Sequence, residues 1–217
     1  MTAESQSISL GSRTRKDPIV YVVDDDEAMR LAVRDLLRSV GLRVEIFESS
    51  HDFLASPKLD VPSCLILDIR LRGESGLTFQ EQIANNDVRI PIVFMTGHGD
   101  IAMTVKAMKA GAVDFLAKPF RDQDMLDAVA NALARDGERL AAEQSNAMLR
   151  AAYQSLTPRE REVMTFVVAG MMNKKIAAEM NVSEITVKIH RGQVMKKMTA
   201  RSVAELVRMS ESLRVTR

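Results

Sequence analysis

The sequence of 217 residues predicts an α/β protein with a doubly wound, five-stranded parallel sheet, followed by a small all-α domain. Over residues 18–134, short apolar runs without polar alternation are interleaved with amphipathic segments of helical period. Such runs are typical of strands buried on both faces of a parallel sheet. Beyond Leu156 only helical patterns remain. Residues 1–134 hold 15 Lys/Arg and 20 Asp/Glu, whereas residues 135–217 hold 15 and 9, so the second domain is predicted to face a polyanion.

The elements of the first domain can be placed from these runs in order. Gly41 and Gly111 predict the C-terminal ends of two helices, and Asp100 is expected to cap the N-terminus of another. Arg72-Gly73 with Gly76 predicts an irregular loop. We expect strands at 19–23, 44–47, 64–68, 92–96 and 113–117, and helices at 27–40, 50–54, 77–85, 101–110 and from about 122 onward.

The second half is predicted to be helical throughout. Residues 122–153 favour one long helix that runs into a linker, because helix formers dominate and Gly137 is the one interruption. Thr157-Pro158 then predicts a new helix, with Glu160 at the spacing of a capping box. Asn181 suits the left-handed position of a tight turn. Further helices are expected at 158–169, 174–180 and 184–198.

Composition narrows the class of protein. Hydrophobic residues make up 46% and charged residues 27%, as in an ordinary soluble globular protein. No apolar run approaches the roughly 18 residues of a membrane-spanning helix, and no apolar segment follows the basic residues near the N-terminus, so we expect no membrane contact and no secretory signal. Cys64, the one cysteine, allows no intrachain disulfide, which suits a reducing cytoplasm. The expected organisation is a disordered leader at 1–17, a first domain at 18–134, a helical linker at 135–154 and a second domain at 155–217.

Polar side chains stand at the C-terminal ends of four predicted strands: Asp24 with Asp25, Asp68, Thr96 and Lys118. In a parallel sheet these ends share one edge, where ligands and chemistry gather. Crowded carboxylates repel one another, so we expect a hard divalent cation, Mg²⁺, to neutralise them. Each residue alone has a simpler interpretation, such as a loop cap or a surface charge. Together they predict phosphoryl transfer to Asp68.

The first domain resembles the receiver domain of two-component response regulators in the motifs Val22-Val23-Asp24-Asp25, Leu67-Asp68, Met95-Thr96-Gly97 and Lys118-Pro119-Phe120. The resemblance implies that Asp68 is the phosphoacceptor, loaded from the phosphohistidine of a sensor histidine kinase. It also implies that Mg²⁺ is held by Asp24, Asp25, Asp68 and the backbone carbonyl of Arg70.

The same resemblance implies a conformational switch. The Thr96 hydroxyl would turn toward the phosphoryl group with Lys118, and the ring of Phe115 would move inward. Without the family, Phe115 is equally well explained as a core residue. The resemblance also implies a cis Lys118-Pro119 bond, a state open mainly to proline. One departure is Arg72, which stands where relatives usually have proline.

Basic residues gather in the predicted helices 174–180 and 184–198. Val187, Val194 and Met198 form an inward stripe, which leaves Lys188 and Ile189 outward. A helix-turn-helix with this charge can place its second helix in the major groove of DNA. The alternative is a basic pair of helices that only packs. The basic residues are Lys174, Lys175, Lys188, Arg191, Lys196, Lys197 and Arg201.

The stretches Leu156-Thr157-Pro158-Arg159-Glu160, Asn173-Lys174-Lys175-Ile176-Ala177 and Thr186-Val187-Lys188-Ile189 resemble the tetrahelical LuxR-type DNA-binding domain. With its receiver the chain is similar to the FixJ/NarL response regulators, and most to the FixJ branch. The resemblance implies base contacts from Lys188 and Ile189. Phosphate contacts are implied for Lys174, Lys175, Thr186 and Lys197.

These features predict a transcription regulator that is phosphorylated on Asp68, forms a homodimer and binds double-stranded promoter DNA, with RNA polymerase as a further candidate partner. No enzyme activity is expected beyond self-phosphorylation and self-dephosphorylation at Asp68. Two alternatives remain open at this point. One is an Mg²⁺-dependent phosphohydrolase whose basic tail binds a partner protein, and the other is a constitutive DNA-binding regulator with a silent receiver.

Overall fold

The computed structural model describes residues 17–86, 88–97 and 101–214. The expected disordered leader, up to Lys16, and the expected cap at Asp100 lie outside the described residues. The contacts divide the chain into two compact units, the first ending at Leu140 and the second beginning at Ala141. Asp136 and Gly137, which fall in the range predicted for the linker, belong to the first unit.

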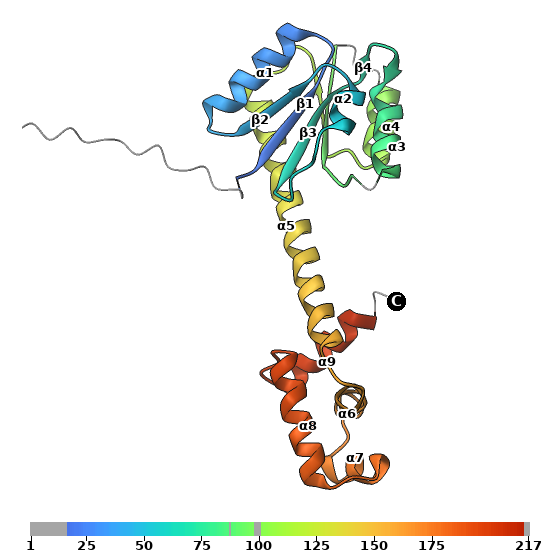
Figure 1. Cartoon of the computed structure of the whole chain (residues 1–217). Coiled ribbons are helices and arrows are strands. Elements are labelled where there is room, and N and C mark those ends of the chain that lie inside the picture. Colours follow the sequence, from blue (N-terminus) through green and yellow to red (C-terminus); the bar gives the residue numbers. More distant parts are fainter. Residues whose placement is uncertain (1–16, 87, 98–100, 215–217) are drawn as a thin grey trace, which may run out of the picture. The chain divides into compact units, whose positions relative to one another are not determined.

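The first unit is built on a parallel sheet, seen in blue to green in Figure 1. Within the described residues it has five strands in the order β2-β1-β3-β6-β7, and every neighbouring pair is parallel. The predicted fold class is therefore confirmed, and each predicted strand matches an observed one to within a residue at either end. The strands are β1 (Ile19–Val23), β2 (Arg43–Phe47), β3 (Ser63–Asp68), β6 (Ile92–Thr96) and β7 (Asp114–Ala117).

Helices cover both faces of this sheet. Successive residues of a strand point to opposite faces, so Tyr21 joins the core under α2 (Ser50–Ala55), α3 (Gly76–Asn85) and α4 (Ile101–Lys109). Val22 points the other way, into the core under α1 (Glu27–Ser39) and α5 (Asp122–Gln154). Every residue of β1 is buried, which is why its sequence shows no polar alternation.

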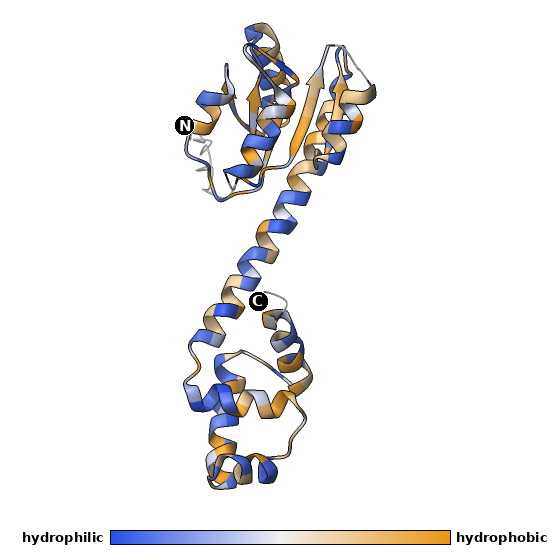
Figure 2. Ribbon diagram, turned by 90° about the vertical axis from the view of Figure 1, so that its right-hand side faces the viewer, coloured by the Kyte–Doolittle hydropathy of each residue, from blue (hydrophilic) through white to orange (hydrophobic). Residues whose placement is uncertain are grey.

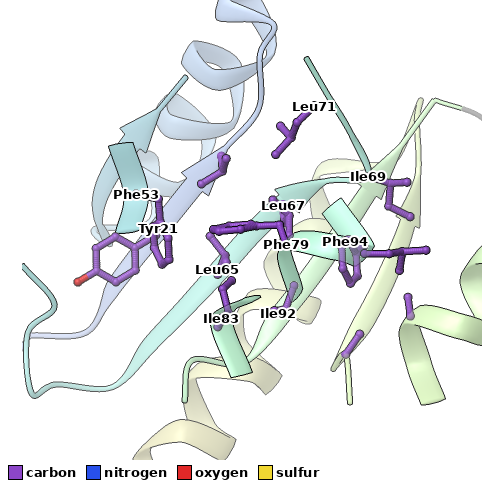
Figure 3. Close-up of a cluster of buried hydrophobic side chains, with 14 of the residues drawn as sticks. Tyr21, Phe53, Leu65, Leu67, Ile69, Leu71, Phe79, Ile83, Ile92 and Phe94 are labelled. Carbon is purple, nitrogen blue, oxygen red and sulfur yellow. The ribbon is translucent and has the colours of Figure 1, made fainter. Parts of the chain in front are cut away.

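Aromatic rings fill the first of these cores, as Figure 3 shows. Phe53 of α2 stands edge-on to Tyr21 of β1, with ring centroids 5.5 Å apart, and edge-on to Phe79 of α3 at 5.9 Å. Edge-to-face pairs of this kind add to the stabilisation from buried apolar area. They fix α2 and α3 against the strands that carry the acidic edge.

The prediction of an irregular loop around Arg72-Gly73 is wrong. Residues Arg70–Leu71 (β4) and Glu74–Ser75 (β5) form a small antiparallel ribbon, with Arg72 and Gly73 at its turn. Gly73 has φ +89°, which glycine adopts without strain. Two-residue strands are too short to show a period in the sequence, so the pattern offered no signal for them.

Helix α5 is continuous over 33 residues and is not broken at Gly137, and Figure 2 shows polar and apolar residues alternating along it. Met125 and Val129 pack on the sheet. The buried carboxylate of Asp136 accepts a hydrogen bond from the Ser63 N–H at 2.8 Å and pairs with Arg139 at 2.8 Å. Helix α5 is thus tied to the start of β3. Although α5 is long, no helix in the described part of the chain is both long and apolar enough to cross a membrane.

The second unit packs four further helices and the last turns of α5 around one core. Thr157 and Glu160 form the predicted capping box, and Asn181 has the predicted left-handed conformation, with φ 54°. The sequence pattern did not predict where helix α9 lies. Only the resemblance to a tetrahelical domain implied that this helix exists. The helices are α6 (Pro158–Val168), α7 (Asn173–Met180), α8 (Glu184–Lys197) and α9 (Val203–Arg214).

Candidate functional site

The ends of β1 and β3 bring three carboxylates together. The two strands pair in register with Val23 beside Leu67, so Asp24, Asp25 and Asp68 come next at the same edge. One oxygen atom from each of these three residues can be chosen so that all lie within 4.8 Å of one another. Asp24 is fully buried and Asp68 is nearly so. The cluster predicted from the strand ends is therefore present in the structure.

Lys118 bridges two of these carboxylates. Its Nζ lies 2.7 Å from Asp24 Oδ2 and 2.6 Å from Asp68 Oδ2. Lys118 comes directly after β7, and its N–H donates a hydrogen bond to the Thr96 carbonyl at 2.6 Å. Its peptide bond to Pro119 is cis, as the resemblance implied. One ammonium thus touches both the predicted phosphoacceptor and a predicted metal ligand.

Burial controls the charges in this cluster. It raises the pKa of Asp24, because the carboxylate has lost water, and hydrogen bonds from Lys118 and the Asp26 N–H offset only part of that effect. For Lys118, burial alone would lower the pKa, but the hydrogen bonds and charges of Asp24 and Asp68 outweigh it and raise the pKa. Lys118 therefore stays charged at neutral pH and stabilises the carboxylates of Asp24 and Asp68.

The donor set fits a magnesium ion. Carboxylate oxygens are the ligands that Mg²⁺ prefers, and a dication would relieve the repulsion among the three neighbouring carboxylates. The Arg70 N–H donates to Asp68 Oδ1 at 2.9 Å and helps to orient that carboxylate. Coordination by the Arg70 carbonyl stays a prediction.

Two arginines at this edge were not assigned a role from the sequence. The buried Arg30 of α1 donates from Nη1 to the Asp24 carbonyl at 2.6 Å and so fixes the backbone beside the cluster. The sequence did contain a signal for the role of Arg30, because this charged residue lies on the buried stripe of α1 together with Val33 and Leu37. Arg72 donates from Nε to Asp25 Oδ2 at 3.1 Å.

The predicted switch residues lie on the neighbouring strands. Thr96 ends β6 at the same edge and is 1% exposed. Phe115 on β7 pairs in register with Phe94 and packs, half-buried, against the core on the α4 side. Thr96 thus lies on the strand next to β3, and Phe115 lies on the strand beyond it, against the core that α4 covers.

Gly76 lies close to the backbone at the end of β3. Its N–H donates to the Ile69 carbonyl at 2.8 Å. A Cβ atom at this position would lie 2.5 Å from the Asp68 carbonyl oxygen and 3.0 Å from the Ile69 Cα. Both are backbone atoms, so no side-chain rotation could relieve the clash.

Gly76→Ala is therefore expected to reduce the free energy of unfolding of the first unit by about 1–3 kcal/mol and to slow the predicted phosphorylation of Asp68. Urea unfolding monitored by circular dichroism, together with a labelling time course, measures the two effects. Gly97→Ala is the matched control, because a Cβ there meets nothing within 4 Å, and its stability should change by less than about 0.5 kcal/mol. If Gly76→Ala matched Gly97→Ala in stability and in labelling rate, the close approach at Gly76 would not be required for folding or for labelling.

The second unit presents a basic, exposed surface on α7 and α8. Val187, Val194 and Met198 are at most 1% exposed, which confirms the predicted inward stripe. Lys174, Lys175 and Lys188 are exposed, and Ile189 is 60% exposed. Thr186 lies in the first turn of α8, where its N–H donates to Ser183 Oγ at 3.1 Å.

Two basic side chains of this segment have partners inside the domain. Lys197 Nζ lies 2.7 Å from the carboxylate of Glu160, a residue that is 5% exposed, and this hydrogen bond lowers the pKa of Glu160. Arg191 Nη1 donates to Asn173 Oδ1 at 3.0 Å. Lys197 thus ties α8 to α6, so its ammonium is already engaged, whereas Lys174 and Lys175 are more exposed.

Comparison with known proteins agrees with this geometry. Residues 20–130 match the model of the response regulator receiver domain, and residues 154–210 match that of bacterial regulatory proteins of the luxR family. Nodulation protein W of Bradyrhizobium diazoefficiens is 56% identical over 91% of this chain and 87% of its own. The transcriptional regulatory protein FixJ of the same species is 42% identical over 88% of this chain and 93% of its own. The structure of response regulator StyR is 46% identical, with a TM-score of 0.84 over 90% of this chain and 98% of that one.

Proposed function

Because this chain belongs to the FixJ/NarL-type response regulators, which join a receiver domain to a LuxR-type DNA-binding domain, we propose that Asp68 is its phosphoacceptor. The chain is a phosphorylation-dependent regulator of transcription. The observation that carries the assignment of Asp68 is its contact with Lys118, 2.6 Å away, at a sheet edge that it shares with Asp24 and Asp25.

The charges at this edge determine the chemistry. A carboxylate oxygen of Asp68 attacks the phosphorus of a phosphohistidine on the sensor kinase, the P–N bond breaks, and its electron pair returns to the imidazole, which takes a proton. The product is an acyl phosphate on Asp68. Lys118 already contacts Asp68, so it can move with the charge onto a phosphoryl oxygen. Mg²⁺, held by Asp24, Asp25, Asp68 and the Arg70 carbonyl, would neutralise the phosphoryl oxygens.

Phosphorylation of Asp68 is proposed to change the conformation of the receiver. The Thr96 hydroxyl turns toward the phosphoryl group and donates a hydrogen bond to it. The ring of Phe115 then moves into the space behind Thr96. The face of α4 and β7 then changes, and two copies associate through it. Val105 and Met108 of α4 support this step, because they are 46% and 43% exposed although apolar. The chemistry on Asp68 is self-phosphorylation from a phosphoryl donor and later self-dephosphorylation by water.

The two domains imply different partners. The receiver implies a sensor histidine kinase, and the LuxR-type domain implies promoter DNA. RNA polymerase is a further partner if the regulator activates transcription. We place the protein in the cytoplasm, because promoter DNA lies there in a bacterium. The comparisons do not favour a phosphohydrolase or a constitutive regulator, because relatives that match over most of the chain include response regulators.

The proposal that α7 and α8 bind DNA rests on exposed lysines, of which one contacts a base and another contacts a phosphate. Lys188→Ala is expected to relax the preference at one base pair per half-site by about 1–3 kcal/mol, because a base contact is lost. Lys175→Ala is expected to weaken specific and random DNA alike and to reduce the salt slope by about one. Fluorescence anisotropy at several salt concentrations, on a site selected from a random pool and on a scrambled duplex, separates the two.

Arg38→Ala is the control for these variants, since it removes one exposed charge from α1 of the other domain. It should leave both affinities unchanged. If Lys188→Ala weakens the selected and scrambled duplexes equally, α8 does not read bases through Lys188.

A further inference from the structure

The turn of the β4–β5 ribbon places a cation on the acidic edge. Pairing of Arg70 with Ser75 and of Leu71 with Glu74 fixes the ribbon directly after the phosphoacceptor strand. Its turn residue Arg72 reaches back to the end of β1, where its Nε lies 3.1 Å from Asp25 Oδ2. The sequence showed Arg72 only as a departure from the usual proline.

Asp25 differs from the other two carboxylates in its partner. Asp24 and Asp68 share the ammonium of Lys118, which sits between them with both contacts at 2.7 Å or less. Asp25 instead pairs with Arg72, whose side chain is 82% exposed while that of Asp25 is 24% exposed. A divalent ion that takes Asp25 as a ligand therefore competes with the Arg72 guanidinium for the charge of this carboxylate.

We propose that Arg72 is a built-in counter-ion that competes with Mg²⁺ for Asp25 and so raises the Mg²⁺ concentration at which the acidic site fills. The inference rests on the proposed function, in which Asp24, Asp25 and Asp68 hold that ion. The effect is electrostatic: a dication at Asp25 weakens the ion pair of that carboxylate with Arg72, and this loss reduces the net free energy of Mg²⁺ binding.

Other carboxylates lie near Arg72 and can accept its guanidinium. A polar hollow of about 410 Å³ adjoins the pair, and its walls include the acidic residues Asp26, Glu27 and Glu48. The released guanidinium can turn toward these carboxylates instead of remaining over the metal. Because exposed ion pairs contribute little, the competition lowers the Mg²⁺ affinity of the site without closing it.

The test is direct titration of the full chain with MgCl₂, monitored by the ¹H–¹⁵N resonances of residues at the ends of β1 and β3. Arg72→Gln is expected to bind Mg²⁺ about two- to fivefold more tightly than the parent protein. This change in affinity corresponds to the usual contribution of one exposed ion pair. Arg72→Lys keeps the charge and should stay near the parent value. The gain in Arg72→Gln should shrink as KCl is raised, because salt screens exposed charges.

Arg43→Gln is the matched control, since Arg43 is also an exposed arginine paired with a carboxylate, Glu45, but at the start of β2 on the opposite edge of the sheet. It should not change the affinity. Equal Mg²⁺ affinity of the parent and Arg72→Gln, or equal tightening by Arg43→Gln, overturns the inference and leaves the metal site intact. Failure of the parent to bind Mg²⁺, or unchanged binding in Asp25→Asn, overturns the proposed site itself.

Discussion

Asp68→Asn is expected to abolish phosphorylation of this chain by acetyl phosphate and Mg²⁺, with a loss of at least about a hundredfold. The substitution replaces one oxygen by nitrogen and keeps the size of the side chain, but a neutral amide is a far weaker nucleophile than a carboxylate. It also removes the charge that holds Lys118 at 2.6 Å. Intact mass measurement should show one added phosphoryl group on the parent protein and none on the variant.

Asp60→Asn is the control, because Asp60 is an exposed aspartate in the loop before β3, away from the C-terminal edge of the sheet. It should be labelled like the parent. Labelling of Asp68→Asn, or labelling of the parent that persists in excess EDTA, would show that the phosphoacceptor or the metal requirement is assigned wrongly. Turnover of an external phosphate ester at enzyme-like rates would instead revive the phosphohydrolase alternative.

The site could be located from the sequence because strand ends are easy to find in a buried parallel sheet. The run that ends at Asp68 is apolar without interruption, since both faces of β3 lie under helices. Once the strand ends were aligned, Asp24, Thr96 and Lys118 had to share one edge. The sheet topology therefore determined which side chains meet.

The ionic partners could not be located in the same way. Periodicity gives the face on which a side chain lies, but an ion pair depends on where two long, flexible side chains end. Arg72 pairs with Asp25 across 47 positions of sequence, and Lys197 pairs with Glu160 across 37. Lys197 had the same sequence signature as Lys175, yet one is engaged within the domain and the other is exposed. Only the tertiary structure shows which of these basic side chains is engaged in an ion pair within the domain.

Phosphorylation is expected to tighten binding to a two-fold DNA site about 5- to 150-fold and to leave binding to a single half-site nearly unchanged. A phosphoryl group adds up to about two negative charges at Asp68, and under the proposed mechanism the responses of Thr96 and Lys118 reshape the face formed by α4 and β7. When two copies associate, the second half-site contact becomes intramolecular and gains from a high effective concentration. The receiver can therefore act on DNA affinity without touching α8.

Sedimentation velocity with and without phosphorylation, beside anisotropy on full and half sites, tests this mechanism. Asp68→Asn treated in the same way is the first control. Val105→Asp is the second, because it places a charge on the exposed apolar face of α4 and should block association while Asp68 is still labelled. A protein that stays monomeric yet tightens equally on both sites would show that phosphorylation releases a masked DNA-binding domain. Affinity for the full site would then no longer depend on Val105, whereas under the proposed mechanism Val105→Asp removes most of the gain.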